Sequence, residues 1–334
     1  MANPYTKARI HKIVRRFGLS PLGSNPVASF YRKNAVLQVK TRSGTYAIKP
    51  FFRNKFLRTS TIHQIKTTTR YVQLLMNGGF GYMPAWLESK SERLWTLDQG
   101  RPFYVTAWIK GRKLEKQEDF IELGRALVTL HTISNGFLQT TRGASARTQI
   151  RYWEIQDRLF RRRMAKAVRK NERNRRWYLN YGEQCNKFSN LAWTELRSPE
   201  IIDLLDREPI RPVLIHNDIT SPNVIISDDG PLFLIDWDHV KVGSIYVELA
   251  KALINTCQFN PDFMHSLLNG YEELYPLNRT ERKLISLIYR LPREAWQATL
   301  FPNRPISRET LSIMERTWAD RLKAMDLLDD WSNQ

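Results

Sequence analysis

The sequence predicts an α+β fold in two parts, a small antiparallel sheet followed by a larger and mostly helical part. Three observations predict it. Strand-like segments dominate up to about residue 110, helical periodicity dominates after Gly111, and one island of extended sequence at 213–238 interrupts the helices. The chain has 334 residues, of which 42% are hydrophobic, so it can bury a sizeable core and is not a disordered protein.

The first part contains two helical and four strand-like segments. Apolar residues at three-to-four spacing predict the helices, and Gly44 lies in the turn of a hairpin. Gly78 and Gly79 follow the second helix and would end it. The expected elements, in order, are a helix over 4–17, strands over 35–40 and 45–49, a helix over 62–76, and strands over 93–97 and 103–108.

The second part is helical apart from the island at 213–238. The segment 117–131 is strongly periodic, and a long basic segment that starts at residue 147 is expected to break near 171–174. The expected helices lie at 117–131, 147–177, 243–257, 261–271, 279–291 and 308–328.

The charge of the chain is unevenly distributed. Lys and Arg number 52 against 33 Asp and Glu, a formal charge of +19. Residues 1–87 hold 15 of the basic residues and no acid, residues 142–176 carry a net +10, and the remainder is mildly acidic. No nucleic-acid-binding motif accompanies either block, and the second block also fits an ordinary solvated helix face. An anionic substrate or docking on an acidic protein layer is therefore favoured over nucleic acid.

Several classes of protein are excluded. No apolar run approaches the ~18–20 residues of a membrane helix, so no membrane partner is expected. The first 22 residues lack the apolar core of a secretory signal. Cys185 and Cys257 are too few for a metal cluster or a disulfide framework, which favours a reducing compartment.

The polar residues that could take part in catalysis or metal binding lie in the extended island. His216, Asp218 and Asn223 follow one short apolar strand, and Asp236 and Asp238 follow another. This arrangement could bring Asp218, Asn223 and Asp236 together at one end of a hairpin. Phosphoryl transfer needs such a set, because one carboxylate orients the attacking hydroxyl while an amide oxygen and a second carboxylate hold Mg²⁺ on the phosphates.

The pattern H-x-D-x-x-x-x-N at 216–223, followed by I-D-W-D at 235–238, resembles the catalytic and metal loops of aminoglycoside-phosphotransferase-like kinases. The resemblance implies a bilobal protein-kinase-like fold that uses ATP and Mg²⁺. It implies that Asp218 is the catalytic base, that Asn223 and Asp236 bind Mg²⁺, and that His216 holds the catalytic loop in place. Asp238 would assist at the metal, and His239 would be either structural or substrate-facing.

The resemblance extends to residues outside the island. Lys49 resembles the third-strand lysine that contacts the α- and β-phosphates, and the backbone from Ala107 to Ile109 resembles the hinge that bonds adenine. Glu248 stands where the family has an acid that braces the catalytic loop. His131 closes the segment that resembles the long helix ahead of that loop, and it is expected to be a helix-end residue. The implied domains are an N-terminal nucleotide-binding lobe at 1–108 and a helical C-terminal lobe at 109–334 that contains the catalytic and metal loops at 213–238.

The C-terminal third is similar to the spore-coat kinase-like (CotS-type) proteins of endospore formers. The similarity rests on the run N-G-Y-E-E-L-Y-P-L at 269–277 and on the apolar helix that ends before Pro292. It implies an ATP-dependent phosphotransferase that acts on a hydroxyl of a small polar or anionic acceptor. It also implies spore-coat proteins as partners, and a location in the mother-cell cytoplasm or the spore coat.

Two departures from the family pattern motivate an alternative function. No acid lies between Lys49 and Glu88, so the helix glutamate that usually pairs with the lysine is missing, and His63 or Gln64 would stand in its place. The expected nucleotide loop at 23–29 has one glycine. The alternative is a catalytically weak or inactive kinase-fold scaffold of the spore coat.

Overall fold

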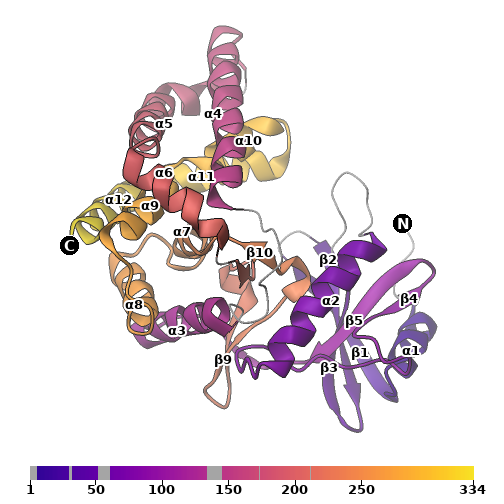
Figure 1. The fold of residues 1–334 in the computed structure, drawn as a ribbon. Helices are drawn as coiled ribbons and strands as arrows, with labels where there is room; N and C mark the ends of the chain where they lie inside the picture. The colour runs from indigo at the N-terminus through magenta and orange to yellow at the C-terminus, as the bar shows by residue number, and fades with distance from the viewer. Residues whose placement is uncertain (1–5, 30–31, 52–60, 134–144, 173, 211) are drawn as a thin grey trace. The chain divides into compact units, whose positions relative to one another are not determined.

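The computed structural model describes residues 1–334 except 1–5, 30–31, 52–60, 134–144, 173 and 211. The chain divides into two compact units (Figure 1). The first comprises residues 1–114 and 222–241, and the second comprises residues 115–221 and 242–334. The first unit holds an antiparallel sheet and the second is mostly helical, so the predicted α+β class is confirmed.

A five-stranded antiparallel sheet forms the body of the first unit, with strand order β1-β2-β3-β5-β4. Helix α1 packs its apolar side against this sheet, where Ile13 and Val14 contact a core that includes Val39 and Val105. The elements are α1 (Lys7–Arg15), β1 (Pro21–Ser29), β2 (Arg32–Thr41), β3 (Gly44–Pro50), α2 (Ile62–Asn77), β4 (Thr96–Asp98) and β5 (Arg101–Ala107).

The prediction of a nucleotide loop at 23–29 is wrong. These residues lie in β1 and pair with β2, with Val27 opposite Val36. Backbone pairing decides this, because the segment has too few apolar residues to be recognised as a strand from its sequence. Residues 30–31, which follow β1, lie outside the described residues.

A second small sheet completes the first unit. It consists of β6 (Gly111–Arg112), β8 (Val224–Ser227) and β9 (Leu232–Leu234), in the order β6-β8-β9. Gly111 lies opposite Ser227, and a Cβ atom at this position would lie 2.0 Å from the carbonyl oxygen of Ile226. Only glycine permits this approach, so residue 111 joins the end of the first sheet to the hairpin that carries the island's aspartates.

The second unit contains the remaining helices and a two-stranded sheet. Strand β7 (Val213–Ile215) pairs with β10 (Lys241–Gly243), which begins at the last residue of the first unit. The helices are α3 (Gln117–Ile133), α4 (Ala146–Arg169), α5 (Arg175–Glu195), α6 (Pro199–Arg207), α7 (Ile245–Thr256), α8 (Pro261–Glu272), α9 (Arg279–Arg290), α10 (Arg293–Leu300), α11 (Pro305–Arg316) and α12 (Trp318–Asn333).

The helices agree with the sequence prediction except at three places. The long basic segment breaks between α4 and α5, as predicted. The single helix predicted over 308–328 is two helices, α11 and α12, which meet at Thr317. Helices α6 and α10 were not predicted, although Ser198 and Pro199 form a recognisable helix start ahead of α6. Among the described residues, no helix is both long and apolar enough to cross a membrane.

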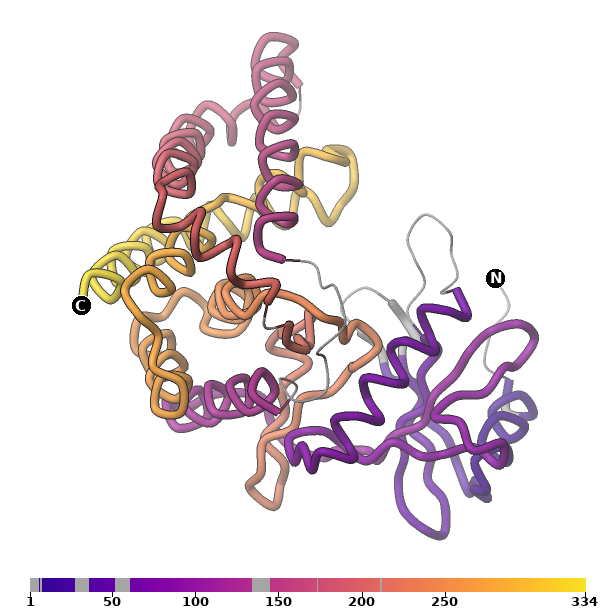
Figure 2. The backbone as a smooth tube through the Cα atoms, in the orientation of Figure 1, coloured from indigo at the N-terminus to yellow at the C-terminus, as the bar shows by residue number. Residues whose placement is uncertain are grey.

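Helices α3 and α8 run side by side (Figure 2), and α3 also packs against β7. A Cβ atom on Gly270 would lie 2.0 Å from the carbonyl oxygen of Ile121, so this glycine allows the two backbones to approach. The next residue, Tyr271, is thereby placed against His131 of α3, with a ring separation of 5.7 Å.

Candidate active site

The first unit gathers three charged side chains from two distant parts of the chain. Lys49 lies on β3, and Asp236 and Asp238 lie at the start of the short helix η4 (Trp237–His239). The ammonium of Lys49 forms an ion pair with Asp236 and lies 3.4 Å from Oδ1 of Asp238. The side chains of Lys49 and Asp236 are 19% and 23% exposed, so this pair remains open to solvent.

Electrostatics keep Lys49 and Asp236 ionised. Burial alone would raise the pKa of Asp236, but hydrogen bonding with Asp238 and the ammonium of Lys49 outweigh burial and hold that pKa well below its usual range. Burial alone would lower the pKa of Lys49, but the carboxylates of Asp238 and Asp236 raise it. The first unit therefore holds an ionised carboxylate beside an ammonium group.

The hairpin of β8 and β9 places Asn223 beside Asp236. Asn223 ends the short helix η3 (Ser221–Asn223), and its carbonyl oxygen accepts a hydrogen bond of 2.9 Å from the N–H of Ile235. Asp236 itself has φ 73°, a left-handed conformation that turns the chain sharply after β9. Trp237 anchors the turn, since its indole N–H donates to the carbonyl of Leu234 at 2.6 Å.

The donor set on this hairpin suits Mg²⁺. An aspartate carboxylate and an asparagine side-chain oxygen are hard oxygen ligands, and Mg²⁺ is usually held by one or two carboxylates together with substrate phosphates. Among the described residues, no group of three His, Cys, Asp or Glu side chains could hold a metal ion by itself. The residues present therefore fit a metal that is shared with a phosphate-bearing ligand.

Tyr104 forms the wall behind this cluster. It lies on β5 beside Lys49 on β3, and its hydroxyl donates a hydrogen bond of 3.5 Å to Oδ1 of Asp236. Its ring stacks on Trp86 with centroids 4.3 Å apart. Burial, together with the neighbouring carboxylates of Asp238 and Asp236, raises the pKa of Tyr104, so the hydroxyl stays a donor. Sequence reasoning missed this residue because a tyrosine inside a strand carries no motif.

The predicted adenine contacts lie at the end of β5. The N–H of Ala107 donates to the carbonyl of Ala85 at 2.8 Å, and the N–H of Trp108 donates to the carbonyl of Thr45 at 3.0 Å. These two bonds fix the backbone just before Gly111. They also use the N–H group of Ala107, so its carbonyl is the polar group that this residue can offer to a ligand.

The expectation that His63 or Gln64 stands beside Lys49 is wrong. Both side chains are exposed in the first turn of α2, where Gln64 forms a capping box with Thr61. Oε1 of Gln64 accepts the N–H of Thr61 at 3.0 Å. Lys49 is instead held by aspartates that follow it in the sequence by almost two hundred residues.

The second unit positions the predicted catalytic loop. His216 follows buried β7 and has an exposed fraction of 0%, while Asp218 is half-buried. The N–H of Asp218 donates to Nδ1 of His216 at 3.3 Å, which requires the imidazole proton on Nε2. Asn217, between them, adopts φ 66°, a left-handed conformation that asparagine tolerates.

Glu248 of α7 braces this loop. Its Oε1 accepts the N–H of Asn217 at 2.6 Å, and its Oε2 lies 2.8 Å from Nε2 of His131. The other imidazole nitrogen of His131 lies 3.0 Å from the hydroxyl of Tyr271. Glu248 therefore occupies the bracing position predicted for it, and the longer side chain reaches both partners. His131 is a link in the brace, a role that its position near a helix end did not reveal.

Burial and hydrogen bonding oppose each other at Glu248. Its side chain is 2% exposed, and burial alone would raise the pKa of the carboxyl. The hydrogen bond and charge of His131, together with the N–H of Asn217, outweigh burial and lower that pKa. Further along the loop, the side chain of Asn255 donates to the carbonyl of Ile219 at 3.2 Å. The loop is thus held directly by two residues of α7, and His131 of α3 and Tyr271 of α8 support Glu248 from behind.

The structure divides the predicted site residues into two sets. Lys49, Ala107, Ile109, Asn223 and Asp236 belong to the first unit. His216 and Asp218 belong to the second.

The sequence profile of the phosphotransferase enzyme family (APH) matches residues 34–284, more than half of the chain. No curated protein matches the sequence.

Solved structures share the fold. An aminoglycoside phosphotransferase from Alicyclobacillus acidocaldarius superposes with a TM-score of 0.83 at 14% identity, over 100% of this chain and 98% of its own. A spectinomycin phosphotransferase in complex with ADP and spectinomycin gives 0.64 at 14% identity, over 98% and 95%. A choline kinase from Streptococcus pneumoniae gives 0.54 at 18% identity, over 92% and 94%. These likenesses confirm the predicted kinase-like fold.

Proposed function

Because the chain belongs to the phosphotransferase enzyme family, we propose that it transfers the γ-phosphoryl group of ATP to a hydroxyl group of a small polar or anionic acceptor. Similar structures named for ADP and spectinomycin, or as a choline kinase, support a nucleotide and a small-molecule acceptor. The observation that carries the proposal is the contact of Lys49 with Asp236 and Asp238 in the first unit, with Asn223 on the same hairpin.

The first unit is proposed to hold the nucleotide. Lys49 would contact the α- and β-phosphates, and Asp236 and Asn223 would hold Mg²⁺, which when bound neutralises charge on the phosphate oxygens. Asp238 is 3.4 Å from the ammonium of Lys49 and would keep it oriented in place of the missing helix glutamate. Adenine would bond to the carbonyl of Ala107 and the N–H of Ile109, since the N–H of Ala107 is already used.

The second unit is proposed to supply the base. Asp218 would accept the proton of the acceptor hydroxyl as that oxygen attacks phosphorus. Its carboxylate is half-buried and accessible, whereas His216 and Glu248 are buried and keep the loop in one conformation. His216 is therefore a positioning residue. It acts through the N–H of Asp218.

A melting experiment tests whether the first unit binds ATP with Mg²⁺. We expect ATP with Mg²⁺ to raise the melting temperature of the wild type, because a ligand that binds the folded state stabilises it. Asp236→Asn keeps a residue that tolerates the left-handed backbone but removes the charge, and should abolish the Mg²⁺-dependent shift. Asp228→Asn is the matched control, because it lies in the turn of the same hairpin and pairs only with exposed Lys110 among the recorded ion pairs of the described residues.

Turnover tests the whole proposal. Wild-type protein should hydrolyse or transfer phosphate from ATP in the presence of a panel of sugars, polyols, amino alcohols and aminoglycosides. The absence of both a Mg·ATP melting shift and turnover across that panel would refute the proposed function.

The spore-coat assignment is a narrower proposal, supported by the similarity at 269–277. It predicts location in the mother-cell cytoplasm or the spore coat and spore-coat proteins as partners. In the alternative, the chain is a weak or inactive kinase-fold scaffold there, which the missing helix glutamate favours. A melting shift that is unchanged in Asp236→Asn, together with no turnover, would favour the scaffold over the enzyme.

A further inference from the structure

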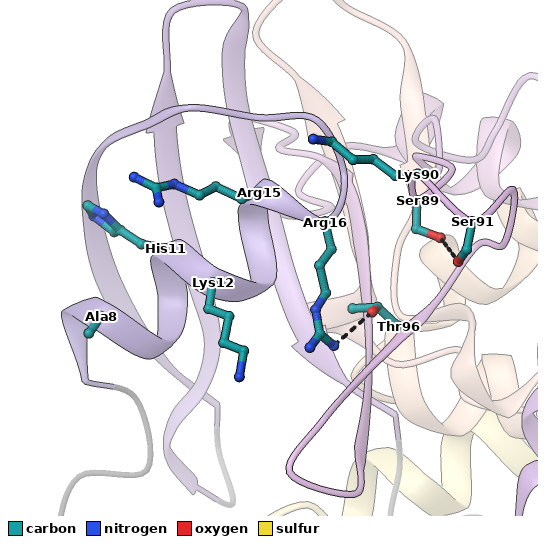
Figure 3. Close-up of a pocket in the computed structure, with 9 residues that line it drawn as sticks. All are labelled: Ala8, His11, Lys12, Arg15, Arg16, Ser89, Lys90, Ser91 and Thr96. Carbon is teal, nitrogen blue, oxygen red and sulfur yellow. Dashed lines mark hydrogen bonds between the residues drawn. The ribbon is translucent and has the colours of Figure 1, made fainter.

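A basic groove lies on the first unit, away from the residues assigned to the nucleotide. It has a volume of about 810 Å³ and is formed by α1 and by the segment that leads into β4 (Figure 3). The polar residues that line it on the two sides are His11, Lys12, Arg15 and Arg16, and Lys90 and Thr96. None of the lining residues is acidic.

The packing of α1 against the sheet determines which of its residues line the groove. Ile10, Ile13 and Val14 are buried against the sheet, so the opposite side of the helix faces outward. Lys12 and Arg15 lie on that outer side and are exposed. The charges are thus presented by a helix whose position the sheet core determines.

Two hydrogen bonds join the walls of the groove. The N–H of Lys90 donates to the carbonyl of Arg16 at 2.7 Å, and Nη1 of Arg16 donates to Oγ1 of Thr96 at 3.2 Å. On the second wall, the hydroxyls of Ser89 and Ser91 lie 3.0 Å apart. The shape of the groove is therefore built into the fold before a ligand binds, which lowers the cost of binding.

Among the recorded ion pairs of the described residues, Asp98 is the one carboxylate that pairs with a lining residue of the groove. Asp98 is 2% exposed, and its Oδ2 accepts a hydrogen bond of 2.6 Å from Nε of Arg9, which does not line the groove. Lys12 reaches the other oxygen only at 3.9 Å and is 63% exposed. The acid-free sequence from 1 to 87 means that α1 brings no acid of its own.

We propose that this groove binds a chain of phosphate groups, as in inorganic polyphosphate or a nucleic-acid backbone. It would contact the phosphates and not the bases of a nucleic acid. Arginine and lysine beside serine and threonine hydroxyls are the donors that phosphate oxygens accept. An acidic peptide would also need apolar contacts, and Ala8 is the one apolar side chain in the lining. Base recognition would need stacking aromatics, and the lining includes no Phe, Tyr or Trp.

A pair of matched triple variants tests this site. Lys12→Gln, Arg15→Gln and Lys90→Gln together remove three charges from the groove and leave Arg16 to hold its walls. Arg158→Gln, Arg162→Gln and Arg169→Gln together remove the same charge from exposed positions of α4. Affinity for fluorescent inorganic polyphosphate is measured by anisotropy over a series of salt concentrations. We expect the groove variant to bind at least tenfold more weakly, with a salt slope smaller by ~0.7 per lost contact, and the α4 variant to bind like the wild type.

The outcomes separate the sources of the phosphate chain. Competition by an oligonucleotide with equal phosphate number identifies a nucleic-acid backbone, and competition by polyphosphate alone identifies the inorganic polymer; either supports the site. Equal loss in both variants, no binding by the wild type, or equally tight binding of poly-glutamate overturns the proposal. A second groove variant, Lys12→Arg with Lys90→Arg, keeps the charge and should bind like the wild type, which guards against loss by misfolding.

Discussion

The two sets of site residues are held by different physical means. In the first unit, Lys49 and Asp236 are about one-fifth exposed, and they are held by opposite charge and by each other. In the second unit, Glu248 and His131 are 2% and 3% exposed, and they are held by hydrogen bonds to half-buried Asn217 and buried Tyr271. The side chains of the first arrangement are thus more exposed to solvent than those of the second.

The difference indicates which side chains can change their partners when a ligand binds. Solvent reaches the ion pair of Lys49 and Asp236, so its members can exchange partners when a ligand arrives. A buried carboxylate that satisfies an N–H and an imidazole is costly to disturb, because each partner would be left unsatisfied. The pair of Lys49 and Asp236 is therefore suited to exchanging ligands. Glu248 and His131 are suited to holding the catalytic loop rigidly.

The largest expected effect is a loss of phosphoryl transfer when Asp218 is substituted. The contacts of Glu248 hold the loop that orients this residue. Asp218→Asn should lower ATP-dependent phosphoryl transfer about 10²–10⁴-fold, because the loop would keep its shape but lose its base. The Mg·ATP melting shift should persist, since nucleotide binding is assigned to the other unit. Transfer within a few-fold of the wild type would show that another group accepts the proton.

The next effect is on the free energy of unfolding, and it compares one substitution in each region. Glu248→Ala should lower the free energy of unfolding by about 3–5 kcal/mol, since it leaves buried partners without their carboxylate. Asp236→Asn should cost less, because its partner Lys49 is one-fifth exposed and still lies 3.4 Å from Asp238. Urea unfolding at neutral pH measures both, and equal costs would remove the contrast between the regions.

Acid should weaken the loop brace in a defined direction. The pKa of Glu248 is lower in the folded protein than its ordinary value, so its contribution is complete above about pH 4.5 and disappears as the pH falls through the folded pKa. Glu248→Gln lacks this contribution. The difference in unfolding free energy between wild type and Glu248→Gln should therefore shrink as the pH is lowered below about 5. A difference that is constant from pH 7 to pH 3 would contradict an ionised brace.

The smallest effect is a difference in thiol labelling. Cys185 and Cys257 are fully buried in the second unit, and burial raises the pKa of each thiol to about 12. At pH 8 a thiol reagent should react slowly with the folded wild type and rapidly after denaturation. Glu248→Ala should increase the labelling rate more than Asp236→Asn does, because only the first substitution loosens the second unit. Equal rates would indicate that the brace does not support this core.

Local pattern predicted much of the fold because the pattern and the packing agree there. The periodicity of 117–131 and the hairpin around Gly44 became α3 and the β2–β3 pair. Strand β1 was missed, because it pairs through its backbone with few apolar side chains. The helix predicted over 308–328 continues its apolar pattern through Thr317, where the chain leaves helical geometry, and no Gly or Pro marks that break.

By itself, the sequence determined the family, the fold class and the polar residues of the island, because closely spaced motifs and helical or strand periodicity are properties of neighbouring residues. Only the tertiary structure decided what holds those residues. Asp236 and Asp238 reach Lys49 across the chain, His131 and Tyr271 join Glu248, and an outward face of α1 meets Lys90 to form a groove. Such partners depend on which surfaces pack together, and spacing along the chain does not encode that.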